Sequence, residues 1–113
     1  MKVLIVDDHA LFRVGLQGLL ERRGLQVVGA AAEGEEGLRL ARTLNPDVVL
    51  LDLRMPDLGG LSVLRHIVEH ELDIPVVMLT TSADESDLSE SLRNGARGYL
   101  LKDMEPDELV LAL

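Results

Sequence analysis

The stretch Val48-Val49-Leu50-Leu51-Asp52-Leu53 decides the fold, because four consecutive aliphatic residues, two of them β-branched, run directly into a single aspartate. A short and continuous apolar run of this kind is typical of a strand buried on both faces, as in a parallel sheet covered by helices. The preceding Asn45-Pro46 pair indicates where the strand begins, since proline disfavours helix in the residue before it. Asp52 then stands at the end of a rigid strand. This position suits a nucleophile or a metal ligand and, equally, a turn or a helix cap.

The composition describes one domain with enough apolar residues for a core. The chain has 113 residues, of which 47% are hydrophobic and 27% charged, and this excludes a disordered composition. Cysteine is absent, so disulfides and thiolate metal sites are excluded and a reducing cytoplasm is the expected location. The N-terminal apolar run meets Asp7-Asp8 too early for a secretory signal, and no apolar run is long enough to span a membrane. The net charge of −9 argues against nucleic-acid binding by this domain and suits a cation site.

Short apolar runs alternate with helical patterns along the whole chain. Gly34 and Gly37 are expected to weaken the second helix by about 1 kcal/mol each relative to alanine. The last pattern stops in the middle of a helical face at Leu113, so we expect a chain cut from a longer protein. We expect strands at residues 3–6, 27–31, 48–53, 75–80 and 99–101, and helices over a segment that ends at Gly24, over 33–44, over 61–71, from the 81–84 loop to about 94, and from about 105 onward.

This alternation predicts an α/β doubly wound (βα)5 fold with a five-stranded parallel sheet and helices on both faces. The crossovers between its parallel strands are expected to be right-handed. The strand order 2-1-3-4-5 is adopted from flavodoxin- and CheY-like folds rather than derived from the sequence. It places the first and third strands side by side at the topological switch point, where such sheets bind ligands beyond the carboxyl ends of their strands.

Polar residues follow four of the five predicted strands. Asp7 and Asp8 follow the first strand, Asp52 ends the third, Thr80 ends the fourth and Lys102 follows the fifth. Because the strands are parallel, all of these residues are expected at one edge of the sheet. Three crowded carboxylates repel one another and need a cation or protons to coexist.

The chemistry of these residues indicates a phosphoryl-transfer site. Oxygen ligands without a His or Cys cluster favour a hard cation, most simply Mg²⁺, with Asp8 as a direct ligand and Asp7 acting more through water. A hydroxyl from Thr80 and an ammonium from Lys102 suit the oxygens of a phosphoryl group. Asp52 is then the nucleophile, and the product is an aspartyl-phosphate.

The same ordered set of residues resembles the receiver domain of two-component response regulators over the whole chain. The resemblance rests on Asp7-Asp8, on Asp52 with Met55-Pro56 and Gly60, and on Thr80 and Lys102, with 28 residues from Asp52 to Thr80 and 22 from Thr80 to Lys102. The start Asp7-Asp8-His9 and the segment 95–103 are most similar to the NarL/FixJ-type subgroup. Members of that subgroup carry a helix-turn-helix DNA-binding domain after the receiver, which is expected here beyond the chain.

The resemblance implies a signalling domain rather than an enzyme. Asp52 would accept a phosphoryl group from a phosphohistidine of a sensor histidine kinase, or from a small phosphodonor. Mg²⁺ would be held by Asp8, Asp52 and the backbone carbonyl of Arg54, with Asp7 beside them. Thr80 and Lys102 would grip the phosphoryl oxygens.

Output is expected through a change of conformation. Tyr99 would switch inward as Thr80 moves and so report phosphorylation to the face of the fourth helix and fifth strand. Phosphorylation is expected to favour a homodimer. DNA would be contacted only by the output domain, and no membrane contact is expected.

Two positions depart from the family pattern. Asp103 stands where many receivers have a proline, often after a cis bond, so the geometry of the Lys102–Asp103 peptide is left open. Gly59 replaces a residue that is commonly Asp or Asn, so a looser loop is expected after Asp52.

Several neighbouring residues are given lesser roles. His9 is interpreted as a surface residue at a helix start rather than as a ligand, and Met55-Pro56 as shaping the loop. Arg54 and Ser82 flank the site and are hypothesised to tune the phosphoryl lifetime. Leu11 lies off the core face and is hypothesised to touch a kinase helix.

Three alternatives stay open at this point. The first is a haloacid-dehalogenase-like phosphohydrolase, although such enzymes want two aspartates spaced by one residue and here Asp7 and Asp8 are adjacent. The second is a flavin-binding module, although one Phe, one Tyr and no Trp leave few stacking partners. The third is a receiver-like interaction module that is never phosphorylated.

Overall fold

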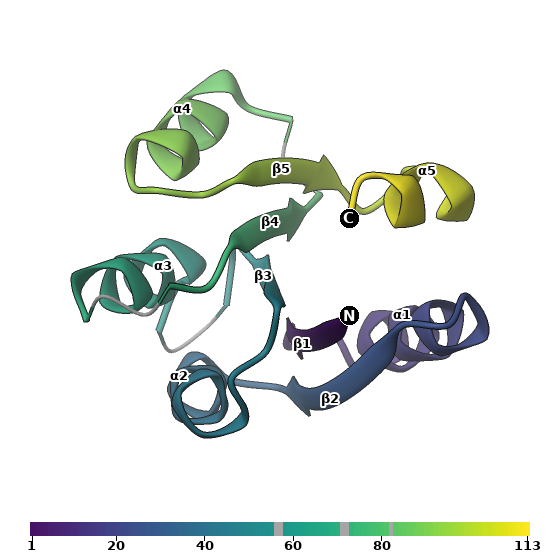
Figure 1. Ribbon diagram of the computed structural model, residues 1–113. Coiled ribbons are helices and arrows are strands. Elements are labelled where there is room, and N and C mark those ends of the chain that lie inside the picture. Colours follow the sequence, from purple (N-terminus) through teal and green to yellow (C-terminus); the bar gives the residue numbers. More distant parts are fainter. Residues whose placement is uncertain (56–57, 71–72, 82) are drawn as a thin grey trace.

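The computed structural model describes residues 1–55, 58–70, 73–81 and 83–113. Within this part of the chain, strands and helices alternate from the N-terminus to the C-terminus, as the hydrophobic pattern predicts (Figure 1). The elements are β1 (Lys2–Val6), α1 (Ala10–Arg22), β2 (Gln26–Ala31), α2 (Gly34–Leu44), β3 (Val48–Asp52), α3 (Gly60–Glu69), β4 (Val76–Thr80), α4 (Glu85–Arg93), β5 (Gly98–Leu101) and α5 (Pro106–Leu111).

The five strands form one parallel sheet in the order β2-β1-β3-β4-β5, which confirms the predicted fold class and strand order. Strand β3 pairs with β1 on one side, where Val6 lies opposite Leu51, and with β4 on the other, where Asp52 lies opposite Leu79. Strands β1 and β3 are therefore neighbours although α1, β2 and α2 separate them in the chain. Their carboxyl ends meet at the same edge of the sheet.

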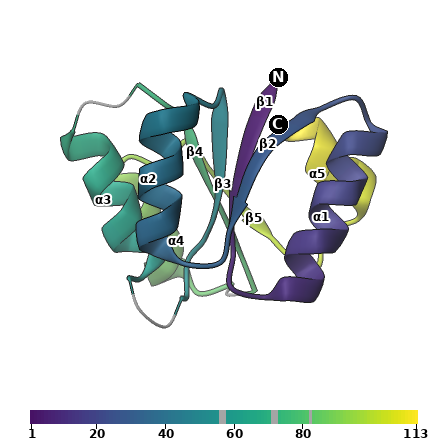
Figure 2. The ribbon, with the colours of Figure 1, turned by 90° about the horizontal axis from the view of Figure 1, so that it is seen from below.

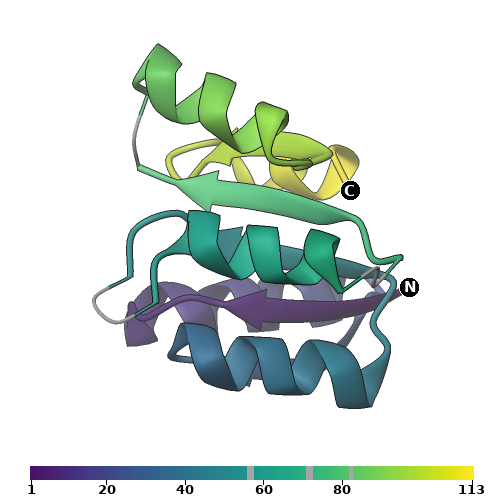
Figure 3. The ribbon, with the colours of Figure 1, turned by 90° about the vertical axis from the view of Figure 1, so that its left-hand side faces the viewer.

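Helices cover both faces of the sheet. Helices α1 and α5 pack on one face and α2, α3 and α4 on the other, as the view along the sheet shows (Figure 2). The three helices of the second face lie side by side over the strands (Figure 3). The described part of the chain contains no helix long and apolar enough to cross a membrane.

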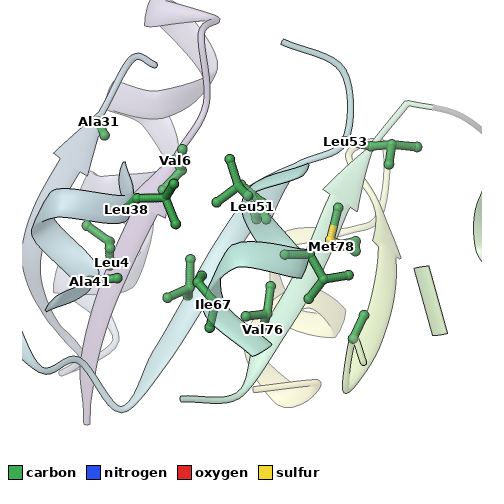
Figure 4. Close-up of a cluster of buried hydrophobic side chains, with 14 residues drawn as sticks. Leu4, Val6, Ala31, Leu38, Ala41, Leu51, Leu53, Ile67, Val76 and Met78 are labelled. Carbon is green, nitrogen blue, oxygen red and sulfur yellow. The ribbon is translucent and has the colours of Figure 1, made fainter. Parts of the chain in front are cut away.

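Strand β3 is buried along its whole length, as its continuous apolar sequence predicts. Side chains alternate along a strand, so Val49 and Leu51 join the core under α2 and α3 while Val48 and Leu50 join the core under α1 and α5. Leu51 lies among side chains from the neighbouring strands and from α2 and α3 (Figure 4). The two cores hold β3 rigidly, and with it the aspartate at its end.

Glycine residues in α2 allow the helix to approach the sheet closely. A Cβ atom on Gly37 would lie 2.8 Å from Cγ2 of Val6, and one on Gly34 would lie 2.8 Å from Cβ of Leu58. Gly34 and Gly37 were expected to weaken the helix, and their helix propensity is indeed poor. Both are nevertheless buried in the described structure, because only a residue without a side chain fits against β1 and against the loop after β3.

The observed boundaries differ from the expected ones by one or two residues, which is the usual uncertainty of helix and strand ends. Strand β2 begins at Gln26 rather than Val27, and β5 begins at Gly98 rather than Tyr99. Helix α3 ends at Glu69 among the described residues, and the expected end at Glu71 lies outside them.

Candidate phosphoryl-transfer site

The ends of β1 and β3 bring three aspartates and a histidine together. Asp7 and Asp8 directly follow β1, and Asp52 is the last residue of β3. The possible ligand atoms of Asp7, Asp8, His9 and Asp52 all lie within 4.8 Å of one another. The sheet topology thus produces the cluster at the edge where the sequence placed it.

Lys102, which follows β5, reaches this cluster from the far side of β4. Its Nζ lies 2.7 Å from Oδ2 of Asp7 and 3.4 Å from Oδ2 of Asp52, and its side chain is only 8% exposed. The ring of Phe12, from α1, lies beneath the ammonium, 4.6 Å from Nζ to the ring centroid. This cation–π contact supports a cation that is largely removed from water. Lys102 therefore supplies a buried positive charge to two of the three carboxylates.

Asp52 is buried and its ionised form is disfavoured. The pKa of the Asp52 carboxyl is raised to about 6, first by burial and second by the negative charge of Asp7. Lys102 and a long hydrogen bond of 3.4 Å from the backbone N–H of Arg54 to Oδ1 of Asp52 act in the opposite direction. The balance leaves Asp52 ionised near neutral pH but poorly stabilised, as a nucleophile should be.

Two carboxylate oxygens of the cluster fit a hard cation. Oδ1 of Asp8 is buried and accepts no hydrogen bond from the described residues, and the buried Oδ2 of Asp52 has only the Lys102 ammonium, at 3.4 Å. A buried carboxylate oxygen is costly unless it is hydrogen-bonded or paired with a cation. Oxygen atoms in this arrangement are the ligands that Mg²⁺ prefers. The donor set therefore fits a divalent cation between Asp8 and Asp52.

His9 takes a more central position than its sequence context indicated. It precedes α1 and its side chain is 64% exposed, as expected of a residue at a helix start. Its Nδ1 nevertheless lies 3.3 Å from both Oδ1 of Asp7 and Nζ of Lys102, and 3.5 Å from Oδ1 of Asp8. The only signal in the sequence was its place directly after the two aspartates.

Thr80 and Lys102 are linked through the backbone. Thr80 ends β4 beside Asp52 and is buried, and its carbonyl accepts a hydrogen bond of 2.8 Å from the N–H of Lys102. Tyr99 lies opposite Met78 in the β4–β5 pairing and is half-buried against the core under α2 and α3. The structure thus places both predicted switch residues on adjacent strands that lead to the site.

Arg54 connects the site to α4 through a contact that sequence reasoning missed. Its Nη2 lies 2.6 Å from Oδ2 of Asp87, and its backbone N–H faces Asp52. Arg54 was predicted to contribute its backbone carbonyl and to tune the phosphoryl lifetime. No local pattern predicts a partner 33 residues away, so Asp87 was not among the candidates.

The loop after β3 turns sharply at a glycine. A Cβ atom on Gly60 would lie 2.2 Å from the carbonyl oxygen of Asp52, so no other residue fits without displacing the backbone. Gly59 has open space around it. The expected roles of Pro56 and Ser82 fall outside the described residues. The peptide bond between Lys102 and Asp103, whose geometry the sequence left open, is trans.

A cavity of about 240 Å³ lies between α1 and α5, next to the site. Leu11, which is 92% exposed, lines it together with Lys102. The remaining lining residues are mostly apolar: Phe12, Gly15, Leu16, Leu19, Met104, Pro106 and Leu109.

Comparisons with known proteins agree with this geometry. The sequence model of the response regulator receiver domain matches residues 3–113. The nitrate/nitrite response regulator protein NarL of Escherichia coli (strain K12) is 44% identical over 112 residues, covering 98% of this chain and 52% of the relative. The response regulator GacA of Pseudomonas aeruginosa is 44% identical over 114 residues, covering 100% of this chain and 53% of the relative. The chain therefore spans about half the length of these relatives.

Solved structures agree as well. The signal receiver domain of a response regulator NarL from Mycobacterium tuberculosis superposes with a TM-score of 0.94 at 38% identity. The match covers 98% of this chain and 90% of that one.

Proposed function

Since the chain belongs to the family of response regulator receiver domains, we propose that Asp52 accepts a phosphoryl group and that its phosphorylation controls an output. The observation that carries the proposal is the position of Asp52, a buried carboxylate beside the Lys102 ammonium and two further aspartates. A nucleophile, a counter-charge for the phosphoryl oxygens and ligands for a cation are the parts that phosphoryl transfer needs.

The transfer is a substitution at phosphorus. A carboxylate oxygen of Asp52 attacks the phosphorus of a phosphohistidine, the P–N bond breaks and the imidazole leaves with the electron pair. Lys102 is held near Asp52 in advance, so its charge stabilises the phosphoryl oxygens without further reorganisation. Thr80, at the end of the adjacent strand, provides the hydroxyl that binds another oxygen once the phosphoryl group is in place.

The proposed cofactor is Mg²⁺, held by Asp8, Asp52 and the backbone carbonyl of Arg54, with Asp7 acting through water. When bound, the cation would neutralise the crowded carboxylates and draw charge from the phosphoryl oxygens. Asp7 also pairs with Lys102.

The proposed partners follow from the family and from the surface around the site. A sensor histidine kinase would supply the phosphoryl group in the cytoplasm, with a helix lying against the apolar cavity that Leu11 and Lys102 line. Thr80 and Tyr99 would carry the change of state to the α4 and β5 face and favour a homodimer. Binding to DNA would belong to an output domain and not to this strongly acidic domain.

Intact-protein mass spectrometry after incubation with acetyl phosphate tests the proposal directly. We expect a single phosphate adduct that requires Mg²⁺, is cleaved by hydroxylamine and is absent from Asp52→Asn. Folded protein that binds Mg²⁺ but forms no adduct would instead indicate an interaction module that is not phosphorylated. Rapid multiple turnover of small phosphate esters would indicate a phosphohydrolase.

A further inference from the structure

An ion pair joins the loop that follows β3 to the first turn of α4. Nη2 of Arg54 lies 2.6 Å from Oδ2 of Asp87, the third residue of α4. The backbone N–H of the same arginine faces Oδ1 of Asp52 at 3.4 Å. One residue therefore contacts the nucleophile with its backbone and helix α4 with its side chain.

From this arrangement we propose that Asp87 is a positioning residue that holds the Arg54 guanidinium on α4, away from the Asp52 carboxylate, and thereby slows phosphorylation of Asp52. The inference rests on the proposed function and concerns the regulation of that same site. It assigns no catalytic step to Asp87, which acts only through Arg54.

The guanidinium of Arg54 is well suited to change partners. Its planar fork matches the oxygens of a phosphoryl group in a bidentate manner. A phosphoryl group carries about −1.5 to −2 charges against −1 for the Asp87 carboxylate, so the phosphoryl group is the stronger partner. The Arg54 side chain is 69% exposed, and water and salt weaken an ion pair at such a position. The existing pair can therefore be exchanged when a phosphodonor arrives.

The exchange couples the site to α4. The Arg54 guanidinium cannot make bidentate contacts with the Asp87 carboxylate and with the phosphoryl group at the same time. Phosphorylation therefore weakens the ion pair with α4. By linkage, breaking that contact favours the phosphorylated state by the same free energy. The rate rises as well, because the guanidinium is then free to contact the phosphoryl oxygens during the transfer. The first turn of α4 keeps its own cap, because Oδ1 of Asp84 accepts a hydrogen bond of 2.8 Å from the N–H of Ser86. Phosphorylation therefore allows α4 to shift relative to the site, while its first turn stays helical.

The experiment measures the initial rate of phosphorylation by acetyl phosphate with Mg²⁺, using intact-protein mass spectrometry. We expect Asp87→Asn to raise the rate roughly two- to fivefold, the size that corresponds to a surface ion pair. Glu85→Gln is the matched control, since it removes the same charge from the same exposed helix turn without touching Arg54. It is expected to leave the rate near that of the wild type.

A double-mutant cycle separates positioning from a simple effect of charge. In an Arg54→Gln background, Asp87→Asn should no longer raise the rate, because the residue on which Asp87 acts is gone. Asp87→Glu should restore the wild-type rate. These readouts depend on Arg54 and would not follow from a general weakening of α4.

Several results would overturn the inference. One is an Asp87→Asn rate equal to that of the wild type, and another is equal acceleration by Glu85→Gln. A third is undiminished acceleration in the Arg54→Gln background, which would mean that the charge of Asp87 acts directly. These results leave the proposed function intact, whereas a wild-type protein that forms no adduct at all would contradict both.

Discussion

The ammonium of Lys102 lies closer to Asp7 than to the nucleophile, at 2.7 Å from Oδ2 of Asp7 against 3.4 Å from Oδ2 of Asp52. Both carboxylates and the lysine side chain are buried, so this pair compensates charge that water does not reach. Lys102 and Asp7 therefore form the closer pair, and Asp52 receives only part of the positive charge of the lysine.

Removing the lysine charge should destabilise the metal-free protein. Lys102→Met keeps much of the aliphatic side chain but leaves buried carboxylates without a counter-ion, which costs about 3 kcal/mol of unfolding free energy. Urea unfolding in the presence of a chelator measures this change. Lys2→Met is the matched control because the Lys2 side chain is exposed on the N-terminal strand. Equal stability of the two variants would show that the Lys102 pair contributes nothing.

The Lys102 variant should also separate metal binding from signalling. The ligands proposed for Mg²⁺ remain in Lys102→Met, so the metal should still raise the thermal stability. The conformational response to phosphorylation should be lost, because the phosphoryl group then lacks its ammonium partner. Hydrogen exchange in β5 and α4 with and without acetyl phosphate measures that response.

Asp52 makes the metal-free protein less stable as the pH rises. Its pKa is raised from the ordinary value of 3.8 to about 6 by burial, with Asp7 as a second cause. Between these values the folded protein holds a proton that the unfolded chain has lost, so stability falls as the pH rises from about 4 to 6. Above pH 6 the full cost remains, and a shift of this size corresponds to about 3 kcal/mol.

Asp52→Asn should therefore stabilise the metal-free protein at pH 8 by roughly 1 to 3 kcal/mol and hardly at all at pH 3.5, where the wild-type carboxyl is protonated. Urea titrations at a series of pH values, in a chelator, measure the difference. Asp73→Asn, at an exposed position, is the control. A difference between wild type and Asp52→Asn that does not depend on pH would contradict the proposed ionisation.

The sequence predicted the fold and the convergence of the site because both depend on local patterns. The apolar run of β3 can only be buried on both sides, and a parallel sheet places its carboxyl ends at one edge, so Asp7 and Asp52 had to lie at the same edge. Their contact depends in addition on the pairing of β1 with β3. The strand order itself was adopted from known folds. No local feature of the β4 sequence predicts which strands β4 pairs with.

Contacts that depend on side-chain reach across elements could not be predicted. The Arg54–Asp87 pair joins a loop to a helix 33 residues away, and nothing near either residue distinguishes it from other exposed charges. Gly37 illustrates a different limit. Helix propensity predicts that Gly37 destabilises α2. The close packing against Val6 that compensates for this depends on how α2 lies on β1, which the local sequence does not reveal.

Mg²⁺ should stabilise the folded protein, and this stabilisation should require the Asp8 carboxylate. Ligand binding to the folded state raises the unfolding free energy by about 2.7 kcal/mol at a concentration one hundred times the dissociation constant. Asp8→Asn should lose most of this response, while the metal-free variant becomes more stable than the wild type because one repelling charge is gone. Thermal unfolding over a Mg²⁺ series measures both effects, with Asp73→Asn as the control. A full Mg²⁺ response in Asp8→Asn would remove Asp8 from the ligand set.

The last prediction concerns the turn that holds the nucleophile. A Cβ atom at position 60 would lie 2.2 Å from the carbonyl oxygen of Asp52 and 2.7 Å from Cα of Leu53, and these backbone atoms belong to the end of β3 and cannot rotate away. Gly60→Ala should therefore push the start of α3 off the strand, cost about 3 kcal/mol and move the Asp52 carboxylate out of position. Both urea unfolding and the rate of labelling by acetyl phosphate should report the change.

Gly59→Ala is the matched control, because a Cβ atom there has no neighbour within 4 Å. Its backbone has a φ of −62°, which any residue adopts. The loss of a glycine N-cap and the lower entropy of the unfolded alanine chain act in opposite directions, so its stability should stay within about 0.5 kcal/mol of the wild type. If Gly60→Ala behaves like Gly59→Ala in both assays, the close approach of Gly60 to Asp52 does not constrain the site.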